Sequence, residues 1–470
     1  MLSNELRTRL ARLDAEIAHH ELSLQHLHEK RTRILDELQA LIYPVLTLPF
    51  EITSKIFLHC LPHNSSSQYH QIRPYPSRDE APIILTRICQ DWRTIALSTP
   101  FLWTYVCIEL DSDDGRGHID SEWIYLLDRW LHRSQKQPLS VVISNLSYTD
   151  PDEALVGVID RHSQQWRDLT LKLPFSHFSR LENHSSLPML QRLTLAGHGS
   201  PDIINPISAF RHAPMLYHVC FEAGMNPSDV ILPWGQLTSF EFYGAGADDC
   251  LELLRLAPNI VNCVFDIQYG SHVLLLGAPL PSLRSFTLSG PAGWGILRYI
   301  SMPALQTLDL SRSPLGPRNF PQLLQFVSRS ECQLRDLKLY VRNAVTTQMI
   351  HLLHCLPSLT KIDMTLAEAD SGTAIFRHLE LSDASFLPHI HSISLYCVQD
   401  DNNQAMFDAV TDALYTRCQS APSGFGSIAS LNLFTQDDVE PPNMRVIQRW
   451  HELAARGMRL CIQNSGERWI

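Results

Sequence analysis

The residues of this chain that could act as nucleophiles, bases or phosphate ligands do not occur at the spacings of the common catalytic motifs. The sequence contains no G-x-S-x-G turn for an activated serine, no G-x-x-x-x-G-K-[ST] loop for a nucleotide phosphate and no H-E-x-x-H pair for a catalytic zinc ion. The glycine-rich stretch Gly290–Gly295 carries a proline and a tryptophan between its glycines, which does not suit a phosphate loop. We therefore predict a protein that is not an enzyme.

The group closest to a metal-binding pattern is His351-x-x-His354-Cys355, which would place two imidazoles near a thiol on one helical turn. Zinc sites need further ligands at defined spacing, and none of the 11 cysteines forms a C-x-x-C pair. We expect no metal ion and no other cofactor. The odd number of cysteines, without such pairs, indicates reduced thiols.

The composition predicts a globular protein with an acidic surface. Hydrophobic residues make up 44% of the 470 residues and charged residues 19%, and the formal net charge is −11. An acidic chain without a basic stripe is not expected to bind nucleic acid. The N-terminus lacks the apolar core of a signal peptide, and no run is long enough to cross a membrane. We therefore expect a cytoplasmic or nuclear protein without a membrane partner.

Residues 2–42 show a heptad pattern, which predicts a coiled-coil helical arm over residues 1–43. Two interleaved series occupy the d and a positions: Leu6, Leu13, His20, Leu27, Ile34 and Leu41, and Leu10, Ile17, Leu24, Arg31 and Leu38. The polar residues His20 and Arg31 would select the register or partner at a cost in stability. The pattern suits self-association or capture of a partner helix, and equally an amphipathic arm that folds back onto its own protein.

The segment from residue 44 to 103 indicates a small helical domain in two halves. One apolar face follows Leu48-Pro49, and a second precedes Pro100, with a polar loop at residues 62–82 between them. A unit with so few ordered residues has too small a core to be stable alone. We therefore expect it to pack against another domain or protein.

These two halves resemble an F-box. The order L-P-x-E-I from Leu48 and the order C-x-x-W-R-x-x-A-x-x-x-P-x-L-W from Cys89 match that motif residue by residue, although the loop is longer than usual. The resemblance implies binding to a Skp-type adaptor and, through it, to a cullin–RING ubiquitin ligase. The residues expected to divide between the adaptor interface and the small core are Leu48, Pro49, Ile52, Ile56, Phe57, Leu61, Leu85, Ile88, Cys89, Trp92, Ile95 and Ala96.

The remainder, residues 104–470, repeats a phrase of the form Pro-x-Leu-x-x-Leu-x-Leu. Copies run over Pro188–Leu195, Pro214–Phe221, Pro258–Phe265, Pro281–Leu288, Pro303–Leu310, Pro357–Met364 and Pro388–Leu395. Looser copies without the proline run over Trp166–Leu171, Leu237–Phe242, Leu334–Leu339 and Ile428–Leu433. Counted through the copy at Leu237, the period from Leu190 to Leu305 is roughly 21 to 26 residues, which is typical of leucine-rich repeats. The Asn or Cys common after L-x-L in that class is mostly missing, so the repeat is irregular.

The repeat predicts an α/β fold in which parallel strands line the concave side of a solenoid and helices cover the convex side. Strands are expected at residues 105–110 and 139–143 and at each L-x-L, and helices near residues 121–132, 249–256, 320–327, 348–356 and 405–415. The period lengthens after residue 305, so longer helices are expected towards the C-terminus.

The side chain between the two leucines of each L-x-L should point to the concave face, where a protein substrate would bind. The positions expected there are Thr194, Cys220, Glu241, Val264, Thr287, Asp309, Lys338, Asp363, Ser394 and Asn432. Their mixture of acidic, basic, hydroxyl and apolar types suits a protein partner better than nucleic acid. Some of these positions would alternatively be simple solvated strand residues.

The function that the resemblance implies is therefore a substrate-recognition subunit of an SCF-type ubiquitin ligase, with no active site of its own. A repeat scaffold that has no ligase role is the first alternative, and the long loop at residues 62–82 keeps it open. An enzyme built on a solenoid is the second, and a perturbed thiol or a bound metal ion would favour it.

Overall fold

A computed structural model describes residues 2–40, 47–62, 79–109, 121–144, 153–181, 186–199, 206–222, 224–270, 279–342, 346–367, 369–381, 386–397, 403–419, 428–436, 441–464 and 468–470. These residues form two compact units, one containing the described residues up to Trp103 and the other those from Thr104 onward. Most of the loop expected at residues 62–82, and the seam position Leu41, lie outside the described residues.

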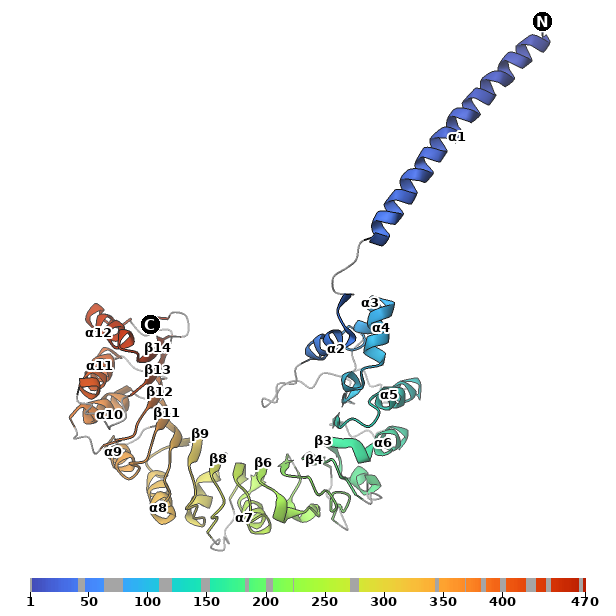
Figure 1. The fold of residues 1–470 in the computed structure, drawn as a ribbon. Helices are drawn as coiled ribbons and strands as arrows, with labels where there is room; N and C mark the ends of the chain where they lie inside the picture. Colours follow the sequence, from blue (N-terminus) through green and yellow to red (C-terminus); the bar gives the residue numbers. More distant parts are fainter. Residues whose placement is uncertain are drawn as a thin grey trace. The chain divides into compact units, whose positions relative to one another are not determined.

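The N-terminal helix, α1 (Leu2–Ala40), is 39 residues long (Figure 1). Every side chain from Glu5 to Glu37 is exposed, including those of the heptad seam. The seam leucine Leu10 is 59% exposed and Ile34 is 56% exposed. The predicted helix is therefore present, and its apolar seam faces solvent along this length.

The rest of the first unit contains α2 (Phe50–His59), α3 (Leu85–Ile88), α4 (Gln90–Leu97) and the 3-10 helix η2 (Pro100–Trp103). Pro49 stands at the N-cap of α2, where its missing N–H costs nothing. Phe57 packs at a ring distance of 5.0 Å from Trp92 and is fully buried. The Trp103 Nε1–H donates a 2.9 Å hydrogen bond to the Ala96 carbonyl, which ties η2 to α4.

The second unit contains a sheet of 14 strands, each paired in parallel with the next along the chain. The strands are β1 (Tyr105–Glu109), β2 (Leu139–Ser144), β3 (Trp166–Pro174), β4 (Arg192–His198), β5 (His218–Phe221), β6 (Ser239–Gly246), β7 (Asn262–Tyr269), β8 (Ser285–Ser289), β9 (Thr307–Leu315), β10 (Asp336–Val341), β11 (Lys361–Leu366), β12 (Ser392–Cys397), β13 (Ser430–Thr435) and β14 (Arg459–Gln463). This sequential parallel order is the solenoid-like α/β arrangement that the repeat predicts.

The strands alternate between buried apolar and partly exposed polar positions, as the L-x-L pattern requires. In β4, Leu193 and Leu195 are fully buried, whereas Thr194 between them is partly exposed. The same alternation recurs at Leu308 and Leu310 of β9. The leucine pairs of successive strands therefore form one continuous core under the sheet.

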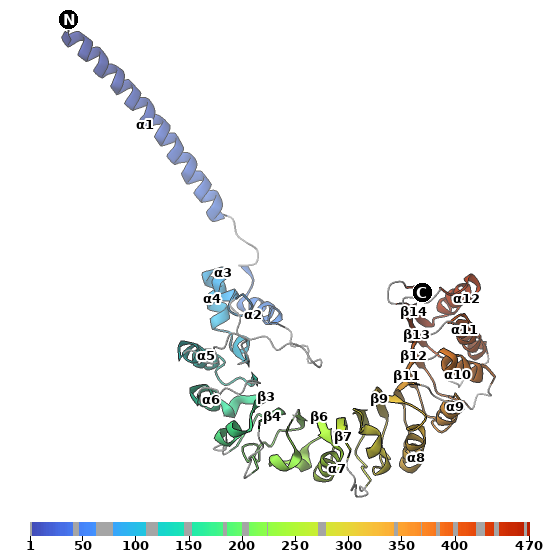
Figure 2. The same cartoon turned by 180° about the vertical axis from the view of Figure 1, so that it is seen from behind.

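Helices lie on one side of this sheet, along the outside of its curve, and the strands line the inside (Figures 1 and 2). They are α5 (Ser121–Arg133), α6 (Glu153–Asp160), α7 (Ala247–Leu256), α8 (Phe320–Ser330), α9 (Thr346–His354), α10 (Ala369–Leu381), α11 (Asn403–Gln419) and α12 (Met444–Ala455), with 3-10 helices η3 (Ser163–Gln165), η4 (Phe175–Leu181), η5 (Pro227–Asp229), η6 (Trp234–Gln236) and η7 (Gly293–Arg298). The expected lengthening towards the C-terminus holds only in part: α11 has 17 residues and α7 has 10, but α9 has 9 and the early helix α5 has 13.

Candidate protein-interaction surfaces

The structure divides the twelve residues expected in the first unit between a core and a surface. Phe57, Leu85 and Ala96 are buried. Leu61, Cys89, Trp92 and Ile95 are partly exposed. The exposed members are Leu48, Pro49, Ile52, Ile56 and Ile88.

Helix α2 has one exposed face and one buried face. Ile52 and Ile56 stand four residues apart on one face and are 44% and 42% exposed. Thr53 and Phe57, each one residue later, are 2% and 0% exposed and face the core. One helix therefore anchors itself with Phe57 while it presents two isoleucines to solvent.

Outside α1, four further large apolar residues of the described part of the first unit are exposed although they were not among the expected set: Phe50, Ile84, Leu97 and Phe101. Ile84 lies four residues before Ile88, so the two share a face of α3 and its first turn. The sequence pattern already places Ile84 on the apolar face before Pro100, although Ile84 was not included in the set expected at the adaptor interface. Among the exposed residues outside α1 we select Leu48, Ile52, Ile56, Ile84 and Ile88, which lie on or beside α2 and α3, and refer to these five below as the exposed apolar residues of the first unit.

The N-cap of α4 is Cys89, which is partly exposed. Cys89 has extended backbone angles, and its Sγ accepts a 3.4 Å hydrogen bond from the Trp92 N–H. That bond satisfies one of the N–H groups left over at a helix start. The Trp92 ring packs against Phe57, so α2 and α4 contact each other at this point.

In the second unit, strand pairing brings the ten expected concave positions into a single row. Each pairs with the next in register, from Thr194 of β4 to Asn432 of β13. We call this the central row. Cys220 and Ser394 are only 6% exposed, so a partner would contact mainly the other members of the row.

Several members of the central row bind each other or a nearby side chain. The Lys338 Nζ lies 3.2 Å from the Asp309 Oδ2, and the Asn432 Nδ2 donates to the Ser394 Oγ over 3.1 Å. Glu241 accepts a 2.8 Å hydrogen bond from the Tyr243 hydroxyl. A ligand would therefore meet a pre-organised polar surface instead of separate side chains.

Asp309 and Asp363 both lie near the charge of Lys338, but their pKa values are shifted in opposite directions. Burial raises the pKa of Asp309, but hydrogen bonds from Ser311 and the charge of Lys338 together outweigh it, so the net pKa lies below its ordinary value. Burial raises the pKa of Asp363, and the charges of Lys338 and Lys361 only partly offset this. Asp309 is therefore favoured over Asp363 as the charged partner of Lys338.

A second polar row, two residues earlier in each strand, was missed. It runs in register through Ser140, Asp168, Arg192, His218, Ser239, Asn262, Ser285, Thr307, Asp336, Lys361, Ser392, Ser430 and Arg459. The signal that could have found it is the polar residue directly before each L-x-L.

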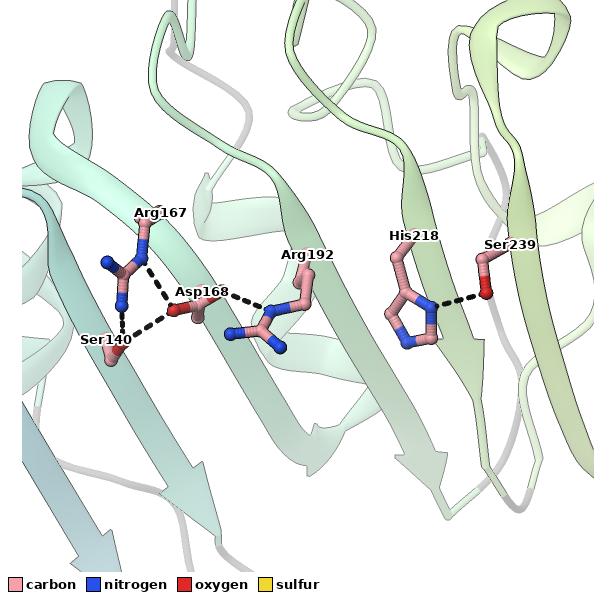
Figure 3. Close-up of polar contacts among 6 residues, drawn as sticks. All are labelled: Ser140, Arg167, Asp168, Arg192, His218 and Ser239. Atoms are coloured by element: carbon pink, nitrogen blue, oxygen red, sulfur yellow. Dashed lines mark hydrogen bonds and ion pairs between the residues drawn. The ribbon is translucent and has the colours of Figure 1, made fainter. Parts of the chain in front are cut away.

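Asp168 is the centre of a cluster in this second row (Figure 3). Its carboxylate accepts hydrogen bonds from Arg192 Nε at 2.6 Å, Ser140 Oγ at 2.7 Å and Arg167 Nε at 2.9 Å. Burial raises the pKa of Asp168, but these three bonds and the charge of Arg167 outweigh it, so the pKa lies below its ordinary value. The cluster joins β2, β3 and β4.

His218 and Ser239 continue the row on β5 and β6 (Figure 3), with the His218 Nδ1 2.9 Å from the Ser239 Oγ. Burial lowers the pKa of His218 more than the nearby Glu241 raises it. His218 is therefore favoured in its neutral form.

An aromatic pair lies near the C-terminal end of the sheet. The rings of Tyr396 in β12 and Phe434 in β13 are stacked, with centroids 4.6 Å apart and an interplanar angle of 8°. Tyr396 is 40% exposed. Exposed aromatic rings are common anchors of protein interfaces.

Of the histidines singled out in the sequence, His354 contacts His378 of α10, with their Nε2 atoms 2.9 Å apart, and both rings contact Phe386. Within the described residues, no group of three or more His, Cys, Asp or Glu side chains could hold a metal ion. None of the helices in the described part of the chain is long and apolar enough to cross a membrane.

Comparison of the sequence with models of known protein families gives no match, and a search of curated proteins finds no similar sequence.

Proposed function

We propose that this chain is the substrate-recognition subunit of a cullin–RING ubiquitin ligase. Its first unit would bind a Skp-type adaptor as an F-box, and the strand face of its second unit, an irregular leucine-rich repeat, would bind a protein substrate. The observation that carries the proposal is the set of exposed apolar residues in the first unit: Leu48, Ile52, Ile56, Ile84 and Ile88.

Exposed apolar side chains in so small a unit favour an interface. Single apolar residues on a surface are ordinary, whereas a group of large ones marks an interaction site. Each is about half exposed, so covering it with a partner contributes roughly 1 kcal/mol. The core beneath is limited to residues such as Phe57 and Trp103, and a small core gains stability from docking.

The first F-box-like motif includes two of the exposed residues, Leu48 and Ile52, and the second motif begins directly after Ile88. The L-P-x-E-I motif begins at Leu48 and leads into α2, and the C-x-x-W-R motif begins at the N-cap Cys89 of α4. Adaptor binding is therefore assigned to the exposed members, and Phe57, Leu85 and Ala96 support them from the core.

The strand face of the second unit supports the recognition half of the proposal. The central row and the second polar row present both signs of charge and hydroxyl groups, and the Tyr396–Phe434 pair lies two residues after the central row on β12 and β13. A surface of alternating polarity with an aromatic anchor suits a folded or extended protein partner. The proposed subunit performs no chemistry, and it would act by raising the local concentration of its substrate near the transferring enzyme.

The proposal is tested by co-expressing the full chain with a Skp-type adaptor and separating the mixture by size-exclusion chromatography. Wild type is expected to co-elute with the adaptor. Ile56→Asp is expected to lose it, because a carboxylate in an apolar interface costs about 3 kcal/mol or more, roughly a 100-fold loss of affinity.

Two control variants separate binding from folding. Met215→Asp introduces the same charge at a residue of the second unit that is 54% exposed, and it is expected to keep the adaptor. Phe57→Asp is expected to unfold the first unit, which gives the circular-dichroism signature of lost structure for comparison with Ile56→Asp. Failure of the wild type to bring the adaptor through the column would favour a repeat scaffold with no ligase role.

A further inference from the structure

The apolar seam of α1 is exposed, and charged residues lie on both sides of it. These charges can be compared with those of a second α1 helix placed parallel or antiparallel to the first. Leu10 and Leu13 stand at a and d positions and are 59% and 55% exposed. Residues at the neighbouring g and e positions lie beside the seam and decide which helix pairs, and in which direction. The g residues are Arg9, Glu16, Ser23, Lys30 and Glu37, and the e residues are Arg7, Asp14, Glu21, His28 and Leu35.

We propose that α1 binds α1 of a second copy of this chain as an antiparallel coiled coil with Leu10 of one copy opposite Ile34 of the other. The proposal does not use the residues assigned to the adaptor, because α1 ends at Ala40 and those residues begin at Leu48. It assigns a definite occupant, direction and register to the exposed seam.

The core layers of this arrangement separate the polar seam residues. Ile17 lies opposite Leu27, His20 opposite Leu24 and Arg31 opposite Leu13. A parallel dimer in register would instead place His20 against His20 and Arg31 against Arg31. Two guanidinium groups facing each other in a seam repel and lose hydration together, so the antiparallel order is favoured.

The flanking charges favour the same order. Antiparallel pairing places g beside g, so that Arg9 faces Glu37 and Glu16 faces Lys30, and the twofold symmetry makes each contact twice. Among the e residues, Asp14 faces His28, and Glu21 facing its own copy is the one like-charge contact. In a parallel dimer Arg9 would face Asp14, but Glu16 would face Glu21.

Shifting one helix of the antiparallel pair by one heptad replaces oppositely charged contacts with like-charged ones. One shift brings Arg9 opposite Lys30 and Asp14 opposite Glu21, and the other brings Glu16 opposite Glu37. The charges therefore select one register. In it, the carboxyl ends of the two helices lie at opposite ends of a coiled coil about 58 Å long.

The test uses the full chain in sedimentation equilibrium, with the double variant Glu16→Lys/Glu37→Lys. In the proposed register the lysine introduced at position 16 faces Lys30 and the one at position 37 faces Arg9, so both contacts become repulsive. The dimer dissociation constant is expected to rise roughly 100-fold. A parallel dimer would become tighter instead, because position 16 would then attract Glu21.

The complementary variant Arg9→Glu/Lys30→Glu is also expected to dissociate, and an equimolar mixture of the two variants is expected to form a heterodimer.

A matched control makes the same change in net charge away from the seam. Glu29→Lys/Asp36→Lys alters two f positions on the opposite side of α1 and is expected to leave the dimer unchanged. Circular dichroism verifies that each variant keeps its helix and sheet. A wild type that remains monomeric at about 100 µM, well above a useful coiled-coil dissociation constant, would overturn the pairing. Tighter association of Glu16→Lys/Glu37→Lys would overturn the antiparallel direction.

Discussion

Replacing Asp168 with asparagine removes one negative charge from the cluster that joins β2, β3 and β4. The carboxylate accepts hydrogen bonds from Ser140, Arg167 and Arg192 at 2.6 to 2.9 Å, and its side chain is 19% exposed. Asparagine has nearly the same shape, but it has one oxygen acceptor and turns an N–H group towards the arginines. The variant therefore tests the charge of the cluster and leaves its packing in place.

The expected loss of stability is about 1–2 kcal/mol. A hydrogen bond to a charged group is worth roughly 1.5–3 kcal/mol when it is shielded from water. The side chains of Arg167 and Arg192 are 43% and 53% exposed, so their contributions are discounted to about 0.2–1 kcal/mol each. The Ser140 bond adds about 1 kcal/mol, of which the asparagine oxygen retains part.

Hydrogen exchange measured by mass spectrometry is the appropriate assay, because a repeat array transmits stability mainly between neighbours. A loss of about 1–2 kcal/mol corresponds to opening that is roughly 5- to 30-fold more frequent in β2–β4. Peptides from β12–β14 should not change. Exchange that increases equally in all strands, or nowhere, would refute the assignment of a local charge cluster. Asp408→Asn, at an exposed carboxylate of α11, is the matched control.

The pH dependence of this effect has a defined sign. The pKa of Asp168 is lowered in the folded chain from its ordinary value of 3.8. The charge therefore stabilises the folded state above 3.8, and this stabilisation is lost as the pH falls through the lowered pKa. The ratio of exchange rates between variant and wild type should be the same at about pH 7 and about pH 5, and should shrink only below about pH 4.

Two further predictions concern a helix end and the thiols. Glu331 caps α8 with φ 48°, so Glu331→Gly should raise the free energy of unfolding by about 0.5–1 kcal/mol in urea titration, whereas Glu331→Ala should give no such gain. Burial raises the pKa of Cys107 to about 11, so at about pH 8 a thiol reagent should modify the exposed Cys60 and Cys355 within the native protein and leave Cys107 unmodified until the chain unfolds. Early labelling of Cys107 in peptide mapping would show that β1 is not packed as described.

The repeating part of the fold was predictable because its signal is periodic. Each L-x-L became a strand with the outer residues buried, as in Leu193 and Leu195, and parallel pairing then placed Thr194 in one row with nine other predicted residues. The helix bounds were less accurate at their ends. The helix expected at residues 348–356 is α9, Thr346–His354, because the end of a helix depends on local turns that the apolar period does not report.

The division of the first unit into core and surface was not predictable from the motif. Ile56 and Phe57 are adjacent and both apolar, yet one is 42% exposed and the other is fully buried. Their difference follows from the rotation of α2 against Trp92, which is a tertiary contact. The second polar row was missed for another reason, since the apolar period reports only the leucines and not the residue before each L-x-L, such as Arg192.

The most direct measurement is a calorimetric titration of the purified full chain with a purified Skp-type adaptor, repeated at several temperatures for wild type and Ile56→Asp. The wild type is expected to bind saturably with a negative heat-capacity change, because apolar surface at Ile52, Ile56 and Ile88 leaves water. Ile56→Asp, with an unchanged circular-dichroism spectrum, is expected to show no binding. A wild type that gives no saturable binding, or a folded variant that binds as tightly as the wild type, would contradict the assignment of this face to the adaptor.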